Sequence, residues 1–237
     1  MLSLSDFFPP EVATLFTDRR MDFTLQDGQS ALSPEQIGYL TAAGFAGSGP
    51  LVFMRQVHGH RVIKVTKSFL RETQGVCEGD ALVTDLPRVQ LAVRTADCLP
   101  IFLYDPVNKC IGLAHAGWKG THTRIVVETL NVMRREWGTD AKDLLVAFGP
   151  SIHACCYEVG PEFREYFKHF PETILERGGR FYLDLPLTNE KQLLKEGVKD
   201  AHVRDCPICT CCREDCFSFR REKEKAGRHL SLIMLLP

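Results

Sequence analysis

The fold is decided between residues 89 and 120, which read VQLAVRTADCLPIFLYDPVNKCIGLAHAGWKG. Three apolar runs of strand length lie in this stretch, at residues 89–93, 101–104 and 111–114. The two segments that separate the runs each contain an aspartate and a proline. Apolar runs of about four to eight residues between turn signals are typical of strands that are buried in a sheet. This stretch therefore predicts the core of a β-sheet.

Further strands and helices are expected on both sides of this stretch. The clearest helix covers residues 121–137, because apolar residues repeat there at helical spacing and Gly138 follows them. Two more helices are expected at residues 161–170 and 188–197. The other expected strands lie at residues 51–57, 61–65, 81–84, 144–148, 181–185 and 230–236.

The chain shows no internal boundary. Residues 1–50 are weakly patterned, and neither a linker nor a low-complexity segment divides the remainder. Clustered strands with interspersed helices indicate an α+β fold. We therefore expect a single domain over residues 1–237, in which mixed β-sheets are flanked by helices in a layered α/β sandwich.

The composition excludes several classes of partner. Hydrophobic residues make up 44% of the 237 residues and charged residues 25%, which is ordinary for a globular protein. A formal net charge of -1 provides no basic field for nucleic acid or an anionic membrane. The N-terminus shows no secretory signal, and the apolar run at 230–236 is too short to span a bilayer. We expect a cytoplasmic protein whose ten cysteines stay mostly reduced.

Three potential metal ligands stand at predicted strand ends beside glycine or proline: His58, Cys98 and His115. Side chains at strand ends share a rim, where loops leave room for a cavity. Two imidazoles and one thiolate suit a tetrahedral zinc site with one open position. A Cys98 nucleophile paired with either histidine accounts for the same residues. The spacing alone does not separate these two interpretations.

Seven motifs of this sequence, in this order, resemble those of the YfiH/DUF152 family, which was long labelled a multicopper polyphenol oxidase or laccase domain. They are QVHG (56–59), GDALVT (79–84), TADCLP (95–100), AHAGWKG (114–120), GPSI (149–152), CYEVG (156–160) and FSFRR (217–221). The resemblance runs from about residue 51 to residue 237. It implies a YfiH-like fold and a purine nucleoside phosphorylase that also deaminates adenosine and splits methylthioadenosine. It also implies that His58, Cys98 and His115 bind a metal, usually Zn²⁺, with Cu²⁺ as the older alternative.

The N-terminal segment departs from the family pattern. Members often begin with an Arg-x-Gly-Gly-Val-Ser stretch and an Asn-Leu element, and residues 1–50 contain neither. The substrate preference is therefore left open by the resemblance.

The implied substrates require further residues. Zinc can activate water to attack an electron-poor purine carbon, whereas phosphate must be held by cations and N–H donors. The candidates to hold phosphate are Arg55, Lys119, Arg220, Arg221 and Arg228, and each of them can also be explained as a solvated surface residue. Asp80 and Asp97 are candidates to bind sugar hydroxyls or to orient a ligand imidazole, and Asp97 also suits a turn. Trp118 suits either a stacking role or the core.

A second set of cysteines lies near the C-terminus, at Cys206, Cys209, Cys211, Cys212 and Cys216. A Cys-x2-Cys pair with further cysteines close by is typical of a structural zinc site or an iron–sulfur cluster. Buried thiols or a redox pair explain the same pattern, and we favour these. Cys156 is expected to be a packing residue.

The leading hypothesis is a zinc-dependent purine nucleoside phosphorylase with adenosine deaminase activity, acting as a monomer or homodimer on a purine nucleoside and phosphate. One alternative is a copper-dependent polyphenol oxidoreductase. Eight histidines with one His-x-His pair, His58 and His60, are few for a multicopper enzyme. Two further alternatives remain. One is a Cys98 thiol hydrolase of cell-wall or peptide substrates, and the other is a non-enzymatic interaction module built on residues 206–216.

Overall fold

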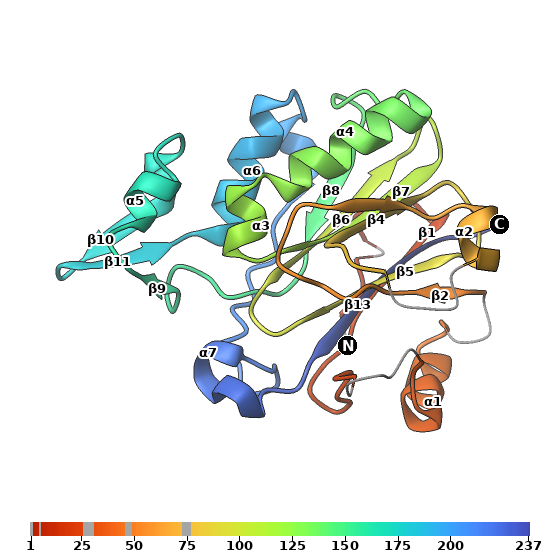
Figure 1. Ribbon diagram of the computed structural model, residues 1–237, viewed down its shortest axis with the longest axis horizontal. Coiled ribbons are helices and arrows are strands. Elements are labelled where there is room, and N and C mark those ends of the chain that lie inside the picture. Colours follow the sequence, from red (N-terminus) through yellow and green to blue (C-terminus); the bar gives the residue numbers. More distant parts are fainter. Residues whose placement is uncertain (1, 5, 26–30, 46–48, 73–76) are drawn as a thin grey trace.

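The computed structural model describes residues 2–4, 6–25, 31–45, 49–72 and 77–237 (Figure 1). Within these residues the largest sheet has the strand order β12-β8-β6-β7-β4-β3. Its strands are β12 (Val203–Arg204), β8 (Leu145–Phe148), β6 (Leu99–Asp105), β7 (Cys110–Ala116), β4 (Ala81–Thr84) and β3 (Val62–Lys64). The β3–β4 and β12–β8 pairs are parallel and the others antiparallel, so the sheet is mixed, as expected.

Strands β6 and β7 form the centre of this sheet and are buried along their whole length. On β6, Leu99, Ile101 and Leu103 pack into a cluster with the helices, whereas Phe102 and Tyr104 pack toward a second sheet. Alternate residues of a strand point to opposite faces. A strand that is covered on both faces therefore reads as a continuous apolar run.

The second sheet has the order β1-β13-β5-β2. Its strands are β1 (Val12–Phe16), β13 (His229–Leu235), β5 (Gln90–Thr95) and β2 (Leu51–Val52). Helix α1 (Pro34–Ala42) contributes Leu40 to a cluster with Leu230 and Leu232 on the outer face of this sheet. Figure 1 shows the layers from α4 through the two sheets to α1.

The helical layer on the other side consists mainly of α3 (Trp118–His122), α4 (Ile125–Trp137) and α6 (Leu185–Lys195). A continuous helix was expected over residues 121–137, but the chain breaks at Arg124, whose φ of 63° is left-handed. Helix α4 ends at Gly138, which also has a positive φ of 74°. The short helix α2 is Lys67–Glu72.

A small arm extends from the layers on the left of Figure 1. Its sheet, in the order β10-β11-β9, consists of β9 (Glu158–Val159), β10 (Ile174–Arg177) and β11 (Arg180–Leu183). Helix α5 (Phe163–Tyr166) lies beside these strands, and helix α7 (Phe219–Glu222) precedes β13 in the chain. The expected helix over 161–170 is therefore much shorter, because turns occupy most of that segment.

The α+β fold class with mixed sheets and helices is confirmed. The N-terminal segment is more ordered than its weak patterning indicated, because β1 completes the second sheet and α1 covers it. The parts of that segment at residues 1, 5, 26–30 and 46–48 lie outside the described residues. None of the described helices combines the length and apolar character that a membrane crossing requires.

The buried His229 is expected to make the fold sensitive to acid. Its Nε2 accepts a hydrogen bond from the Phe217 N–H at 2.7 Å, and its ring packs against Phe16 and Phe217. Burial lowers the pKa of His229 from 6.5 to about 4. The unfolded chain therefore takes up this proton first as the pH falls. The stability provided by neutral His229 is complete above its unfolded pKa and is lost as the pH falls through about 4.

Between pH 7 and pH 5, the unfolding free energy of the wild type is expected to fall by about 2 kcal/mol more than that of His229→Gln. Glutamine keeps an acceptor for the Phe217 N–H but does not titrate in this range. Urea unfolding of both proteins at the two pH values measures the difference. An identical pH dependence in the two proteins would show that His229 is not responsible.

Candidate metal centre

The structure brings His58, Cys98 and His115 together. One ligand atom from each lies within 4.8 Å of the other two, and the Cys98 Sγ is 3.7 Å from the His58 Nε2. Cys98 directly precedes β6 and His115 is the penultimate residue of β7. Because these strands pair with Leu99 opposite Ala116, Cys98 and His115 lie at the same end of the hairpin. His58 comes from the loop between β2 and β3.

Asp80 holds both histidines of this group. Its Oδ1 lies 2.9 Å from the Nδ1 of His115, and its carboxylate accepts the backbone N–H groups of His58 and Gly59 at 2.9 and 2.7 Å. Burial opposes ionisation of Asp80, but His115 and these N–H donors outweigh it and lower the pKa of Asp80. An imidazole that is held at Nδ1 presents Nε2 to a ligand. Asp80 therefore sets which nitrogen of His115 is available.

The electrostatics of the group favour a thiolate. Burial disfavours the charged forms of both Cys98 and His115. The neighbouring His115 and His58 nevertheless lower the pKa of the Cys98 thiol to about 6. The pKa of His115 is raised in turn by Cys98 and Asp80. Thiolate is the form of cysteine that binds metals or attacks as a nucleophile.

One member of the group and one neighbouring residue have left-handed backbone conformations, His58 with a φ of 58° and Asp97 with a φ of 85°. Such conformations are uncommon outside glycine and are typical of functional sites. The Asp97 carboxylate accepts hydrogen bonds from Thr210 Oγ1 at 2.7 Å, Ser218 Oγ at 3.1 Å and the Arg220 N–H at 2.6 Å. Asp97 therefore links Cys98 to the C-terminal segment that contains residues 210–220.

Gly117 allows the side chains of His58 and Cys98 to lie close together. A Cβ atom at this position would lie 2.9 Å from the Cδ2 of His58 and 3.0 Å from the Sγ of Cys98. A larger residue at position 117 would separate the possible ligands. The close approach, the Asp80 contact at Nδ1 of His115 and the lowered pKa of Cys98 together fit a metal ion bound by two imidazoles and one thiolate.

A cavity of about 900 Å³ opens over these three residues. This volume lies in the range of small-molecule sites. Six of the residues that line it carry a cationic side chain: Arg55, Arg94, Lys119, Arg220, Lys223 and Arg228. Asp97 is the one carboxylate among the described lining residues. The cavity is therefore suited to an anionic substrate next to a metal centre.

Most of the predicted substrate residues lie at this cavity. Arg55, Lys119, Arg220 and Arg228 line it, as does Asp97. Arg55 forms an exposed ion pair with Glu78. The Arg220 side chain donates to the Cys156 carbonyl at 3.4 Å and lies over the Tyr157 ring.

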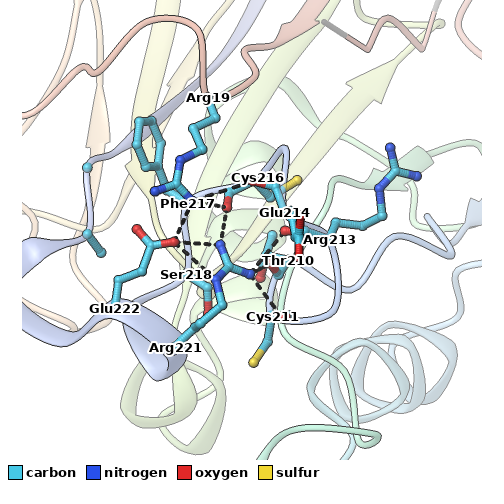
Figure 2. A network of polar contacts seen from close by, with 12 residues as sticks. Arg19, Thr210, Cys211, Arg213, Glu214, Cys216, Phe217, Ser218, Arg221 and Glu222 are labelled. Carbon is cyan, nitrogen blue, oxygen red and sulfur yellow. Dashed lines mark hydrogen bonds and ion pairs between the residues drawn. The ribbon is translucent and has the colours of Figure 1, made fainter.

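Two predicted residues lie elsewhere. Asp80 is below the cavity, in contact with His115. Arg221 does not line the cavity, and Figure 2 shows its guanidinium turned toward the loop that precedes α7. It donates to the carbonyls of Thr210, Cys211, Arg213 and Cys216 and pairs with Glu222. These partners occupy the N–H groups that a phosphate would need.

Arg94 and Tyr157 also line the cavity, although neither was a predicted site residue. Arg94 lies in β5, and its Nε is buried and has no hydrogen-bond partner in the described part of the chain. Burial and the charge of Arg228 lower the pKa of Arg94. The sequence signal that could have identified Arg94 is a single arginine in a strand whose other residues are buried. Trp118 lines the cavity and also stacks on Tyr166 and packs on Phe163.

We expect Asp80→Asn to weaken zinc binding by about 10- to 100-fold, which is the usual cost of losing a carboxylate behind a ligand imidazole. Asparagine has nearly the same shape but lacks the charge that Asp80 places beside His115. Competition with a chromogenic chelator measures the affinity. A matched control is Asp85→Asn, because Asp85 follows the same strand, β4, at its other end. Unchanged zinc affinity in Asp80→Asn would remove the orienting role of this carboxylate.

The chain is similar to several known proteins over most of its length. The sequence profile of a family described as "Multi-copper polyphenol oxidoreductase laccase" matches residues 15–236. A protein named "Purine nucleoside phosphorylase" from Aquifex aeolicus is 35% identical over 191 residues, covering 81% of this chain and 86% of that protein. A protein named "Adenosine deaminase RL5", from an unknown prokaryotic organism, is 37% identical over 75% of this chain and 72% of its own length. The crystal structure of YfiH from Bacillus licheniformis superposes with a TM-score of 0.82 at 29% identity, covering 94% of this chain and 92% of that one.

Proposed function

The chain belongs to the YfiH/DUF152 family, and on this premise we propose that it is a zinc-dependent purine nucleoside phosphorylase that also deaminates adenosine. The substrates are adenosine, inosine or methylthioadenosine, with phosphate as the second substrate of phosphorolysis. The observation that supports this most is the single cavity in which a His58–Cys98–His115 centre faces a group of cationic side chains. The names of its relatives, a phosphorylase and a deaminase, are in keeping with that pairing.

His58, Cys98 and His115 are the proposed zinc ligands. An ion bound there supplies Lewis acidity and activates water at neutral pH. Asp80 keeps the His115 Nδ1 occupied, which would leave Nε2 to bind the ion. The lowered pKa of Cys98 keeps the thiol ionised near neutral pH, which favours binding.

Arg94 and Arg228 are proposed to bind the phosphate, assisted by Lys119 and Arg220. The charge of Arg228 disfavours the charged form of Arg94, and an anion that lies between the two guanidinium groups relieves this repulsion. Arg94 also has a buried Nε without a partner in the described chain, which a phosphate oxygen would satisfy. In phosphorolysis a phosphate oxygen forms a bond to the anomeric carbon as the bond from that carbon to the purine nitrogen breaks. The electron pair leaves with the base, which takes up a proton.

The purine is proposed to lie against the aromatic side chains of the cavity wall. Trp118, Tyr157 and Phe219 line the cavity, and the Phe219 side chain is exposed. Flat apolar faces of this kind bind nucleobases by stacking. Asp97 is proposed to position the C-terminal wall through Thr210 and Ser218, since its oxygens already accept their hydrogen bonds.

We favour this proposal over copper-dependent phenol oxidation. Among the described residues, two groups of three or more side chains can hold a metal, and only one of them contains histidine. A multicopper oxidase requires several histidine-rich sites.

Incubation of zinc-loaded protein with adenosine, inosine or methylthioadenosine, with and without phosphate, tests the proposal. Free base and sugar 1-phosphate are expected only when phosphate is present, whereas inosine is expected from adenosine in either case. Failure to release base from all three nucleosides would exclude phosphorolysis. Phenol oxidation that requires added copper and is absent with zinc would support the oxidoreductase.

A further inference from the structure

Four cysteines meet at a second place in the molecule, outside the centre described above. The sulfur atoms of Cys155, Cys156, Cys209 and Cys212 all lie within 4.8 Å of one another. The Sγ of Cys212 is 3.6 Å from that of Cys155 and 3.3 Å from that of Cys156. All four are free thiols. They come from two segments that lie more than fifty residues apart in the chain.

Backbone pairing brings the two segments together. Ser151, just after β8, forms a parallel bridge to Cys209. The Ser151 N–H donates to the Ile208 carbonyl at 3.3 Å, and the Thr210 N–H donates to the Ser151 carbonyl at 2.9 Å. This pairing places the turn with Cys155 and Cys156 against the turn with Cys209 and Cys212.

The surroundings of Cys209 suit a thiolate. The His153 N–H points at its Sγ at 3.5 Å. The backbone N–H groups of Cys211 and Cys212 also face this sulfur atom. Backbone donors that converge on a sulfur atom stabilise its negative charge, as required of a metal ligand.

The loop with Cys209 and Cys212 is held in shape by arginine side chains. Figure 2 shows Arg221 inside this loop, where it donates to the carbonyls of Thr210 and Cys211 at 3.0 and 2.9 Å. Arg19 adds an ion pair to Glu222 at 2.6 Å. A prearranged loop reduces the ordering that binding would otherwise require.

We propose that Cys155, Cys156, Cys209 and Cys212 bind a second, structural zinc ion. With Zn–S distances of about 2.3 Å, the sulfurs of a tetrahedral site lie about 3.8 Å apart. The observed separations need to change by only a fraction of an ångström to about one ångström to reach this arrangement. An iron–sulfur cluster places several iron atoms between its cysteines and needs wider spacing. A disulfide would use two of the four sulfurs and leave the convergence of the others unexplained.

The site would brace one wall of the cavity. Tyr157, which lines the cavity, directly follows Cys156, whose carbonyl accepts the Arg220 side chain at 3.4 Å. Thr210, directly after Cys209, donates to Asp97 at 2.7 Å. An ion at the four cysteines therefore stabilises the segments that position Tyr157 and Arg220. The inference rests on the cysteines alone and does not depend on the proposed function.

Metal analysis of the reduced full-length protein tests the site, with His115→Ala as background so that only the second site contributes. In that background we expect about one zinc per chain, lost in Cys155→Ser and in Cys212→Ser. Cys211→Ser is the matched control, because Cys211 lies in the same loop but outside the four-sulfur group. This control is expected to retain the ion.

Cobalt titration of the same background protein gives an independent readout that needs no cysteine variant. We expect intense thiolate-to-cobalt charge transfer and the visible bands of a tetrahedral ion. Absence of these bands would overturn the proposal. So would retention of zinc in both serine variants or equal loss in Cys211→Ser.

Discussion

Replacing Cys98 by alanine is expected to remove the zinc ion from the proposed active centre and to lower kcat/KM for nucleosides by about 10³-fold or more. Cys98 is the one anionic ligand of the three, and its sulfur lies 3.7 Å from the His58 Nε2. Without it two imidazoles remain, and two neutral ligands hold zinc weakly. His58→Ala and His115→Ala are expected to behave in the same way. Metal content and steady-state kinetics of the same preparations measure both effects.

The same variant separates the two chemistries that Cys98 can support. Loss of turnover with the metal content unchanged would assign Cys98 as a nucleophile and favour a thiol hydrolase. Its lowered pKa, about 6, is compatible with either role, so kinetics alone do not decide. Cys77→Ala is the control, since the Cys77 thiol belongs to neither group of possible ligands. It is expected to keep both metal and activity.

Replacing Arg94 by methionine is expected to raise the KM for phosphate by about 10- to 100-fold, in line with the loss of a charge-assisted hydrogen bond. Adenosine deamination, which does not use phosphate, is expected to change by much less. Methionine keeps the apolar stem of Arg94 and removes the charge that burial and Arg228 destabilise. Initial rates over a range of phosphate concentrations give the KM.

Arg135→Met provides the matched control, because Arg135 is an exposed residue of α4 that does not line the cavity. It is expected to leave the KM for phosphate unchanged. Equal losses of phosphorolysis and deamination in Arg94→Met would mean that Arg94 supports the structure of the cavity rather than phosphate binding.

The central part of the fold could be predicted from the sequence because burial leaves a simple pattern. Strands β6 and β7 are covered on both faces and appear as apolar runs, and α4 shows an amphipathic repeat that ends at Gly138. Strand β1 and helix α1 were overlooked. Helix α1 buries only Gln36 and Leu40, so it has no broad apolar face, although Ser33 and Gln36 form a capping box at its start.

The site was predictable only in part. No local spacing links His58, Cys98 and His115, and it is the register of β6 and β7 that makes Cys98 and His115 neighbours. The motifs around these three residues resemble those of a known family, and this resemblance indicated a shared metal site. The direction of a long side chain depends on its tertiary partners, which the sequence does not show. This explains why Arg221 was predicted to hold phosphate and Arg94 was not. The same limit applies to Cys156, which was expected to pack but lies beside three other thiols.

In the proposed function, one cavity combines the metal centre with phosphate binding for the phosphorolysis of purine nucleosides. Its most direct test is the product balance from inosine at saturating phosphate, measured for hypoxanthine and ribose 1-phosphate in the same reaction. We expect the two products to form in equal amounts and neither to form when phosphate is omitted. Hypoxanthine released together with free ribose, at a rate independent of phosphate, would contradict phosphorolysis in this cavity.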